Sequence, residues 1–167
     1  MKTSMHALAL LMIASTAAPA AACPVDPEFF PSPDPALAAL PFSEAVRHGD
    51  LLFVSGQIGT APRTDAVVPG GIEPEARQAL QNVKAILERH DSSLERVVKC
   101  TVFLADMKDW PAFNGVYRGF FKSNLPARSA LGANGLALGA RVEVECLAAV
   151  SPPASRGRPG PLPSPSP

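Results

Sequence analysis

The segment that most restricts the fold of this chain is 141–150, in which charged and apolar residues alternate strictly over 141–146. A period of two residues is typical of a β-strand whose two faces meet different surroundings. We therefore expect a half-buried strand with one core face and one charged face. The charged face carries Arg141, Glu143 and Glu145.

Two other segments show the spacing of an amphipathic helix. Apolar residues three and four positions apart predict a helix over Glu75–His90, with Pro74 at its start, where a missing N–H costs no hydrogen bond. An aromatic stripe predicts a second helix from Trp110, with Asp109 as its N-cap and Pro111 in its first turn. We interpret the aromatic side chains of this stripe as core residues.

The remaining regular segments complete an α+β pattern. Ser43–Arg47 and Leu51–Ile58 predict a hairpin with a bulge near Gly56, and Val97–Leu104 predicts a central strand. The order hairpin, helix, strand, helix, strand, strand favours a mixed sheet with two helices on one face. Because the open sheet face also carries apolar residues, we expect another subunit to cover it.

Proline-rich segments bound this unit. We interpret 23–41 as an extended linker without regular structure, 42–150 as the folded domain, and 151–167 as a disordered Pro/Ser-rich tail.

The first 22 residues have the pattern of an export signal. Lys2 precedes an apolar run, and three alanines at 20–22 form a small-residue cleavage site. We therefore expect an exported protein, most simply in a bacterial periplasm. Cys23 directly follows the cleavage site, so lipidation at this residue is an alternative and would be the only membrane attachment. Simple secretion is favoured, because Ala20 is smaller than the residue usual at that position of a lipoprotein signal.

Cys100 and Cys146 both fall inside predicted strands, on the side shared with valines. Export permits a disulfide between them, but bridging requires Cα atoms within about 7 Å. Two buried thiols are the favoured interpretation.

Several function classes are disfavoured. The 15 basic and 15 acidic residues balance, which leaves no basic footprint for nucleic acid and argues against a nuclease. The three histidines are scattered, and no histidine or cysteine pair has metal-ligand spacing, so we expect no metal and no cofactor.

The chain resembles the RidA family of YjgF-type enamine/imine deaminases. The resemblance covers essentially all of 42–150 and lies in four segments that occur in the family's order. These are Phe53–Ile58, Arg77–Leu87, Val98–Leu104 and Pro126–Ser129. The resemblance implies a chorismate-mutase-like α+β fold that assembles as a homotrimer, with active sites in the clefts between subunits.

The resemblance also implies site residues. Arg128 matches the arginine that binds the substrate carboxylate, and Glu145 matches the acid that positions or activates water. Independently of the resemblance, Glu143 lies on the same predicted strand face and could be mistaken for the partner or substitute of Glu145. Residues matching those that line the cleft are Ser55, Gly56, Asn114 and Phe42. Two positions depart from many members and leave the substrate open: Phe42 replaces a tyrosine, and Ala130 replaces a cysteine.

The implied reaction is hydrolysis of 2-aminoacrylate or a 2-imino acid to a 2-keto acid and ammonia. Arg128 would bind the carboxylate by charge-assisted hydrogen bonds. Glu145 would take a proton from the attacking water. The alternative is a non-catalytic trimer that binds a small carboxylate or an unfolded protein in the same clefts.

Overall fold

The computed structural model describes residues 25–150. The predicted signal, Cys23 and the predicted tail lie outside the described residues. Within 25–150 no helix is long and apolar enough to cross a membrane. The strands are β1 (Glu28–Phe30), β2 (Ala45–His48), β3 (Leu51–Ile58), β4 (Val97–Leu104), β5 (Ala127–Gly132) and β6 (Val142–Ala149). The helices are α1 (Pro35–Ala38), α2 (Ile72–Arg89) and α3 (Trp110–Phe120), with 3-10 turns η1 (Leu94–Arg96), η2 (Met107–Asp109) and η3 (Ala137–Gly139).

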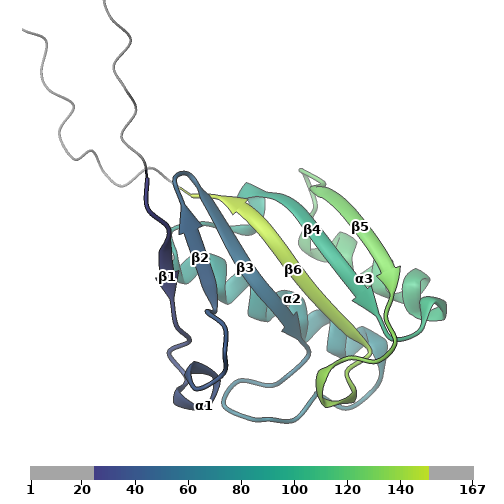
Figure 1. Cartoon of the computed structure of the whole chain (residues 1–167). Helices are drawn as coiled ribbons and strands as arrows, with labels where there is room; N and C mark the ends of the chain where they lie inside the picture. The colour runs from purple at the N-terminus through teal and green to yellow at the C-terminus, as the bar shows by residue number, and fades with distance from the viewer. Residues whose placement is uncertain (1–24, 151–167) are drawn as a thin grey trace, which may run out of the picture.

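The six strands form one sheet in the order β1-β2-β3-β6-β4-β5. All neighbours are antiparallel except β4 and β5, which run parallel because α3 connects them. Helices α2 and α3 lie on one face of the sheet, and the other face is open (Figure 1). This arrangement confirms the predicted α+β fold with two helices on one face of a mixed sheet.

The core lies between the two helices and the sheet. On β6 every second residue is buried, so the predicted alternation is confirmed. Helix α2 buries one apolar stripe, in agreement with the predicted spacing. The buried residues of these two elements include Ala76, Ala79, Leu80, Val83, Ile86, Leu87, Val142, Val144, Cys146 and Ala148.

Part of the predicted linker has regular structure, so the expectation of none in 23–41 is wrong. Strand β1 pairs with β2, and Asp34 caps the single turn of α1 by accepting a hydrogen bond from the N–H of Ala36. Phe30 also stacks on His90 at the end of α2, with ring centroids 4.3 Å apart. None of the prolines lies in β1, and Pro35 is the first residue of α1, where its missing N–H costs no hydrogen bond. Proline content alone therefore could not exclude an edge strand.

The two inner cysteines form a disulfide, so the favoured interpretation as thiols is wrong. Cys100 on β4 and Cys146 on β6 are directly opposite in the ladder, their Cα atoms are 4.1 Å apart, and both are fully buried. The spacing of 46 residues gave no sign of this pairing, because it depends on the register between two strands that are distant in sequence.

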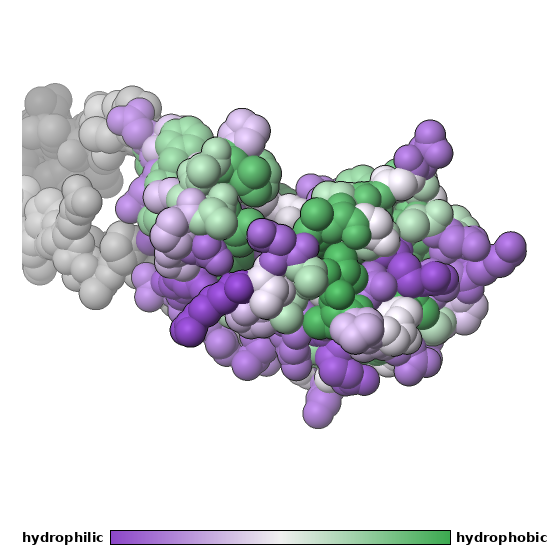
Figure 2. Space-filling model, turned by 90° about the horizontal axis from the view of Figure 1, so that it is seen from below, coloured by the Kyte–Doolittle hydropathy of each residue, from purple (hydrophilic) through white to green (hydrophobic). Residues whose placement is uncertain are grey.

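The open sheet face carries exposed apolar side chains. Phe29, Phe53 and Leu131 keep 64%, 41% and 43% of their surface accessible. The strand register places all three on the open face, because each is paired across the sheet with residues whose side chains point to that face. More exposed apolar residues lie at the end of the molecule that carries α1 and η3. Figure 2 looks at this end and shows hydrophobic patches between polar side chains. These residues include Leu37, Leu40, Phe42 and Leu138.

Candidate functional site

Arg128 lies on β5, which is an outer strand of the sheet. The parallel register places Arg128 opposite Cys100, whose side chain is in the core, so Arg128 points toward the helix-covered face. Because β5 is an edge strand with no strand of 25–150 on its outer side, the Arg128 side chain can extend over α3. There its Nη2 donates a 2.7 Å hydrogen bond to Oδ1 of Asn114. The structure thus brings together two of the predicted site residues.

Two aromatic rings of α3 lie beneath the Arg128 guanidinium. Its central carbon is 4.6 Å from the ring centroid of Tyr117 and 5.7 Å from that of Phe113. Both distances are within the range of cation–π attraction. We call Arg128, Asn114, Phe113 and Tyr117 the arginine half-site. The two rings were interpreted from the sequence as core residues only, although Tyr117 follows Phe113 by four positions and Asn114 by three, a spacing that makes Tyr117 a neighbour of both on the helix surface.

Burial also affects the Tyr117 hydroxyl. Removal from water raises the pKa of Tyr117 to about 12, and the nearby positive charge of Arg128 opposes this rise. The phenol is therefore neutral at physiological pH. Its oxygen is the buried side-chain polar atom that has no hydrogen-bond partner within 25–150.

The two carboxylates of β6 lie on the open face of the sheet. Glu145 is opposite Thr101 of β4, and Glu143 is two register pairs further along, between Phe103 of β4 and Ile58 of β3. Alternation along β6 puts both carboxylates on the side away from the helices.

Glu143 lies against the bulge of β3. The β3–β6 register shifts between Val54 and Gln57, which confirms the predicted bulge near Gly56. A Cβ at position 56 would overlap the Glu143 carboxylate, so only glycine leaves room for this side chain. The glutamate that lies against Gly56 is therefore Glu143. The glutamate predicted from the sequence to act on water is Glu145.

The environment of Glu143 favours its protonated form. Partial burial raises the pKa of the Glu143 carboxyl, and repulsion from the Glu145 carboxylate raises it further. A carboxyl with a raised pKa can exchange a proton more readily near neutral pH. Glu143 therefore has both a raised pKa and a defined position against the bulge at Gly56.

Ser55 and Phe42 lie near the same bulge. The Ser55 hydroxyl donates a 2.7 Å hydrogen bond to the backbone oxygen of Ser43, which ties the segment after Phe42 to β3. Phe42 directly precedes Ser43 and is 56% exposed. We call Phe42, Ser55, Gly56, Glu143 and Glu145 the acidic half-site.

The two half-sites point to opposite faces of the sheet within one chain. Arg128 shares the helix-covered face with Cys100, whereas Glu143 and Glu145 lie on the open face. A small ligand therefore cannot touch the guanidinium and a β6 carboxylate of the same subunit through the sheet. Sequence reasoning named every member of the acidic half-site but only Arg128 and Asn114 of the arginine half-site, and it did not place the two half-sites on opposite faces of one chain.

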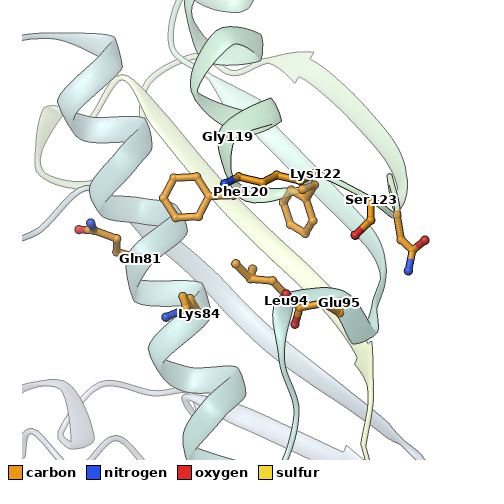
Figure 3. Close-up of a pocket in the computed structure, with 10 residues that line it drawn as sticks. Gln81, Lys84, Leu94, Glu95, Gly119, Phe120, Lys122 and Ser123 are labelled. Carbon is orange, nitrogen blue, oxygen red and sulfur yellow. The ribbon is translucent and has the colours of Figure 1, made fainter.

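A cavity of about 520 Å³ lies elsewhere, between α2, η1 and the segment after α3 (Figure 3). Leu94, Phe120 and Phe121 give it apolar walls, and Lys84 and Lys122 lie at its edge. None of the predicted site residues lines it. Within 25–150 no group of three or more His, Cys, Asp or Glu side chains could hold a metal ion.

Comparison with known sequences places the chain among proteins of one family. The family model described as Endoribonuclease L-PSP matches residues 34–150. The mouse 2-iminobutanoate/2-iminopropanoate deaminase is 42% identical over 112 residues, which cover 67% of this chain and 83% of the mouse protein. The human protein of the same name is also 42% identical over 112 residues and is covered to 82%.

Solved structures show the same fold. The protein YyfA of the Rid family from Yersinia pestis superposes with a TM-score of 0.70 at 32% identity, covering 75% of this chain and all of that one. RidA from the Antarctic bacterium Psychrobacter sp. gives a TM-score of 0.65 at 31% identity, covering 77% of this chain and all of that one.

Proposed function

This chain belongs to the Endoribonuclease L-PSP family, and we propose that it hydrolyses 2-imino acids, such as 2-iminobutanoate and 2-iminopropanoate, to 2-keto acids and ammonia. The proposal rests on relatives named as deaminases of these two imines at 42% identity. The observation that carries it in the structure is the pair of half-sites, an arginine held ready for a carboxylate and a carboxyl with a raised pKa.

The chemistry needs no more than these groups. The Arg128 guanidinium binds the substrate carboxylate. Water adds to the carbon of the protonated imine while a β6 carboxylate takes one of the water protons, and the electrons of the carbon–nitrogen double bond leave the nitrogen as a neutral amine. The β6 carboxyl then returns its proton to this nitrogen, the carbon–nitrogen bond breaks so that ammonia leaves, and the hydroxyl loses its proton to solvent as the carbonyl forms. A 2-aminoacrylate first takes a proton at its methylene carbon to become 2-iminopropanoate.

The geometry favours Glu143 as the group that handles the proton. Glu143 lies against the Gly56 bulge, and burial raises its pKa. Glu145 is the residue predicted from the sequence, and its assignment stays a prediction. Its charge acts in either case, because repulsion from Glu145 is the second cause of the raised Glu143 pKa.

We further propose that the active unit is a homotrimer. The half-sites point to opposite faces of one chain's sheet, so a substrate touching both must lie between two chains. The exposed apolar side chains of the open face support burial against another copy. The threefold number comes from the family resemblance. A monomeric mass in light scattering would remove the site between subunits.

Export to an oxidising compartment, most simply the periplasm, remains part of the proposal. Residues 1–22 supply its main support, and the Cys100–Cys146 disulfide is consistent with it, because such bonds persist mainly outside the cytosol. Whether Cys23 carries a lipid stays open. Detergent partitioning of the full-length protein before and after Cys23→Ser distinguishes an anchored from a secreted form.

The direct test uses the chain without residues 1–22. An amino-acid oxidase generates the imino acid in place, and semicarbazide competes with hydrolysis by trapping it. We expect Arg128→Ala to raise KM by about 10- to 100-fold, since a charge-assisted contact is worth about 1.5–3 kcal/mol. Glu143→Gln should lower kcat by about 10²- to 10⁴-fold, as removal of a general base does.

Two further variants separate the β6 carboxylates. Gly56→Ala displaces the Glu143 side chain and should reduce kcat with little loss of stability, because the displaced group is the flexible end of a side chain. If Glu145→Gln abolishes kcat while Glu143→Gln and Gly56→Ala do not, the sequence assignment holds and the geometric one is wrong. If the wild-type protein does not lower the amount of semicarbazide adduct, it does not hydrolyse the imino acid. The alternative, a non-catalytic carboxylate-binding protein, then remains.

Complementation tests the shared site. Arg128→Ala and Glu143→Gln chains should each have strongly reduced activity alone at substrate concentrations below the wild-type KM, but regain activity when co-expressed with different tags. If each site takes the arginine from one subunit and the acid from its neighbour, random mixing restores about one quarter of the sites. No recovery in verified mixed assemblies would contradict a site between subunits.

A further inference from the structure

The Arg128 guanidinium is oriented by neutral side chains and not by a carboxylate. Its polar partner is the side-chain oxygen of Asn114, at 2.7 Å, and its central carbon lies over the rings of Tyr117 and Phe113. Within residues 25–150, no Asp or Glu forms a salt bridge with it. Arg141, by contrast, is paired in bidentate fashion with Asp109, at 2.9 and 2.8 Å.

This difference has a chemical consequence. A carboxylate partner would orient an arginine, but it would compete with the carboxylate of a ligand for the same donors. An aromatic face attracts the cation through its quadrupole and occupies none of its N–H groups. The arrangement therefore orients Arg128 while most of its donors stay available.

The ring of Tyr117, not its hydroxyl, makes this contact. Tyr117 is 4% exposed, and its hydroxyl has no hydrogen-bond partner in the described part of the chain. The nearer ring to Arg128 is that of Tyr117. The ring is itself fixed by packing between Phe113 and Phe121, with centroids 5.6 and 4.5 Å away. It is thus a rigid support for the guanidinium.

We propose that Tyr117 is a positioning residue whose aromatic face holds Arg128 in the orientation that receives the substrate carboxylate. This inference rests on the proposed carboxylate-binding role of Arg128. It assigns Tyr117 a part in substrate affinity, beyond its place in the core.

The test varies the electron density of the ring while its shape is kept. Tyr117→Phe retains the aromatic face and removes the hydroxyl, and trifluorophenylalanine incorporated at position 117 has nearly the same shape with a weakened quadrupole. We expect Tyr117→Phe to keep the wild-type KM. The fluorinated ring should raise KM by roughly three- to thirtyfold with kcat almost unchanged. A role in packing alone predicts equal KM values for both variants.

Direct binding gives a second readout. Calorimetry with 2-oxobutanoate, the keto-acid product, should show the same loss of affinity in the fluorinated variant. The uncharged 2-oxobutanamide should bind all variants equally, because it lacks the carboxylate. Val116→Ala is the matched control, since it removes buried volume on the same helix, and it should leave KM unchanged.

The outcomes separate this inference from the proposed function. If Arg128→Ala raises KM in an active wild type but the fluorinated ring does not, Tyr117 does not position Arg128 and only the proposed function stands. If the wild type neither hydrolyses imines nor binds 2-oxobutanoate, the proposed function fails, and NMR still tests the contact. The side-chain protons of Arg128 should then show an upfield ring-current shift that Tyr117→Leu reduces, and its absence overturns the inference.

Discussion

Breaking the Cys100–Cys146 disulfide should destabilise the protein substantially. The bond joins neighbouring central strands and closes a loop with a sequence separation of 46 residues. In the chain-entropy treatment, a loop of this length contributes about 4 kcal/mol by restricting the unfolded chain. For a unit of this size, that corresponds to a fall in Tm of roughly 12–20 °C.

The assay compares oxidised and reduced protein of one sequence, the chain without residues 1–22 and with Cys23→Ser. Thermal unfolding is followed by circular dichroism with and without reductant, at one protein concentration because assembly also shifts Tm. The Cys100→Ala/Cys146→Ala variant is the control. It should melt near the reduced protein and should not respond to reductant.

Two results would refute this reasoning. Two reactive thiols per chain in denatured, unreduced protein would show that the disulfide does not form. If the bond is present but reduction lowers Tm by only a degree or two, the loop-entropy argument fails, because the unfolded chain is then restricted by other means.

The remaining predictions concern Glu143 and two glycines. Because the pKa of Glu143 is raised above its unfolded value near 4.5, the unfolded state loses this proton first as pH rises, so the folded state becomes relatively less stable. Glu143→Gln should therefore match the wild-type Tm below pH 4 and exceed it increasingly above that pH; a constant difference would contradict the titration. Gly59→Ala should destabilise by about 1–3 kcal/mol, because its Cβ would lie 2.7 Å from backbone atoms of Glu75. Gly115→Ala, with open space around its Cβ in helix α3, should instead stabilise by about 0.5–1 kcal/mol in denaturant unfolding; a loss for both variants would show that steric clearance is not what separates them.

Local patterns predicted most of the secondary structure. Alternation in 141–150 and the three-four spacing of α2 follow from which side chains must leave water, and this requirement acts on residues close in sequence. Asp109 shows the limit of such patterns. It occupies the N-cap position of α3, but its carboxylate accepts hydrogen bonds from Arg141 and none from the helix N–H groups. The predicted N-cap position is confirmed, but the side chain does not cap the helix, because its carboxylate pairs with Arg141, a partner far along the chain.

The sequence by itself determined the α+β class, the buried faces of its helices and strands, and the residue types of the candidate site. Only the tertiary structure decided which of these residues meet. Strand register joined Cys100 to Cys146, placed Glu143 against the bulge at Gly56, and turned Arg128 to the face opposite the β6 carboxylates. A register is set by packing between segments that are distant in sequence, and one residue of slip moves every side chain to the other face. Periodicity within a segment indicates which of its side chains share a face, but not which residues of another strand lie opposite them.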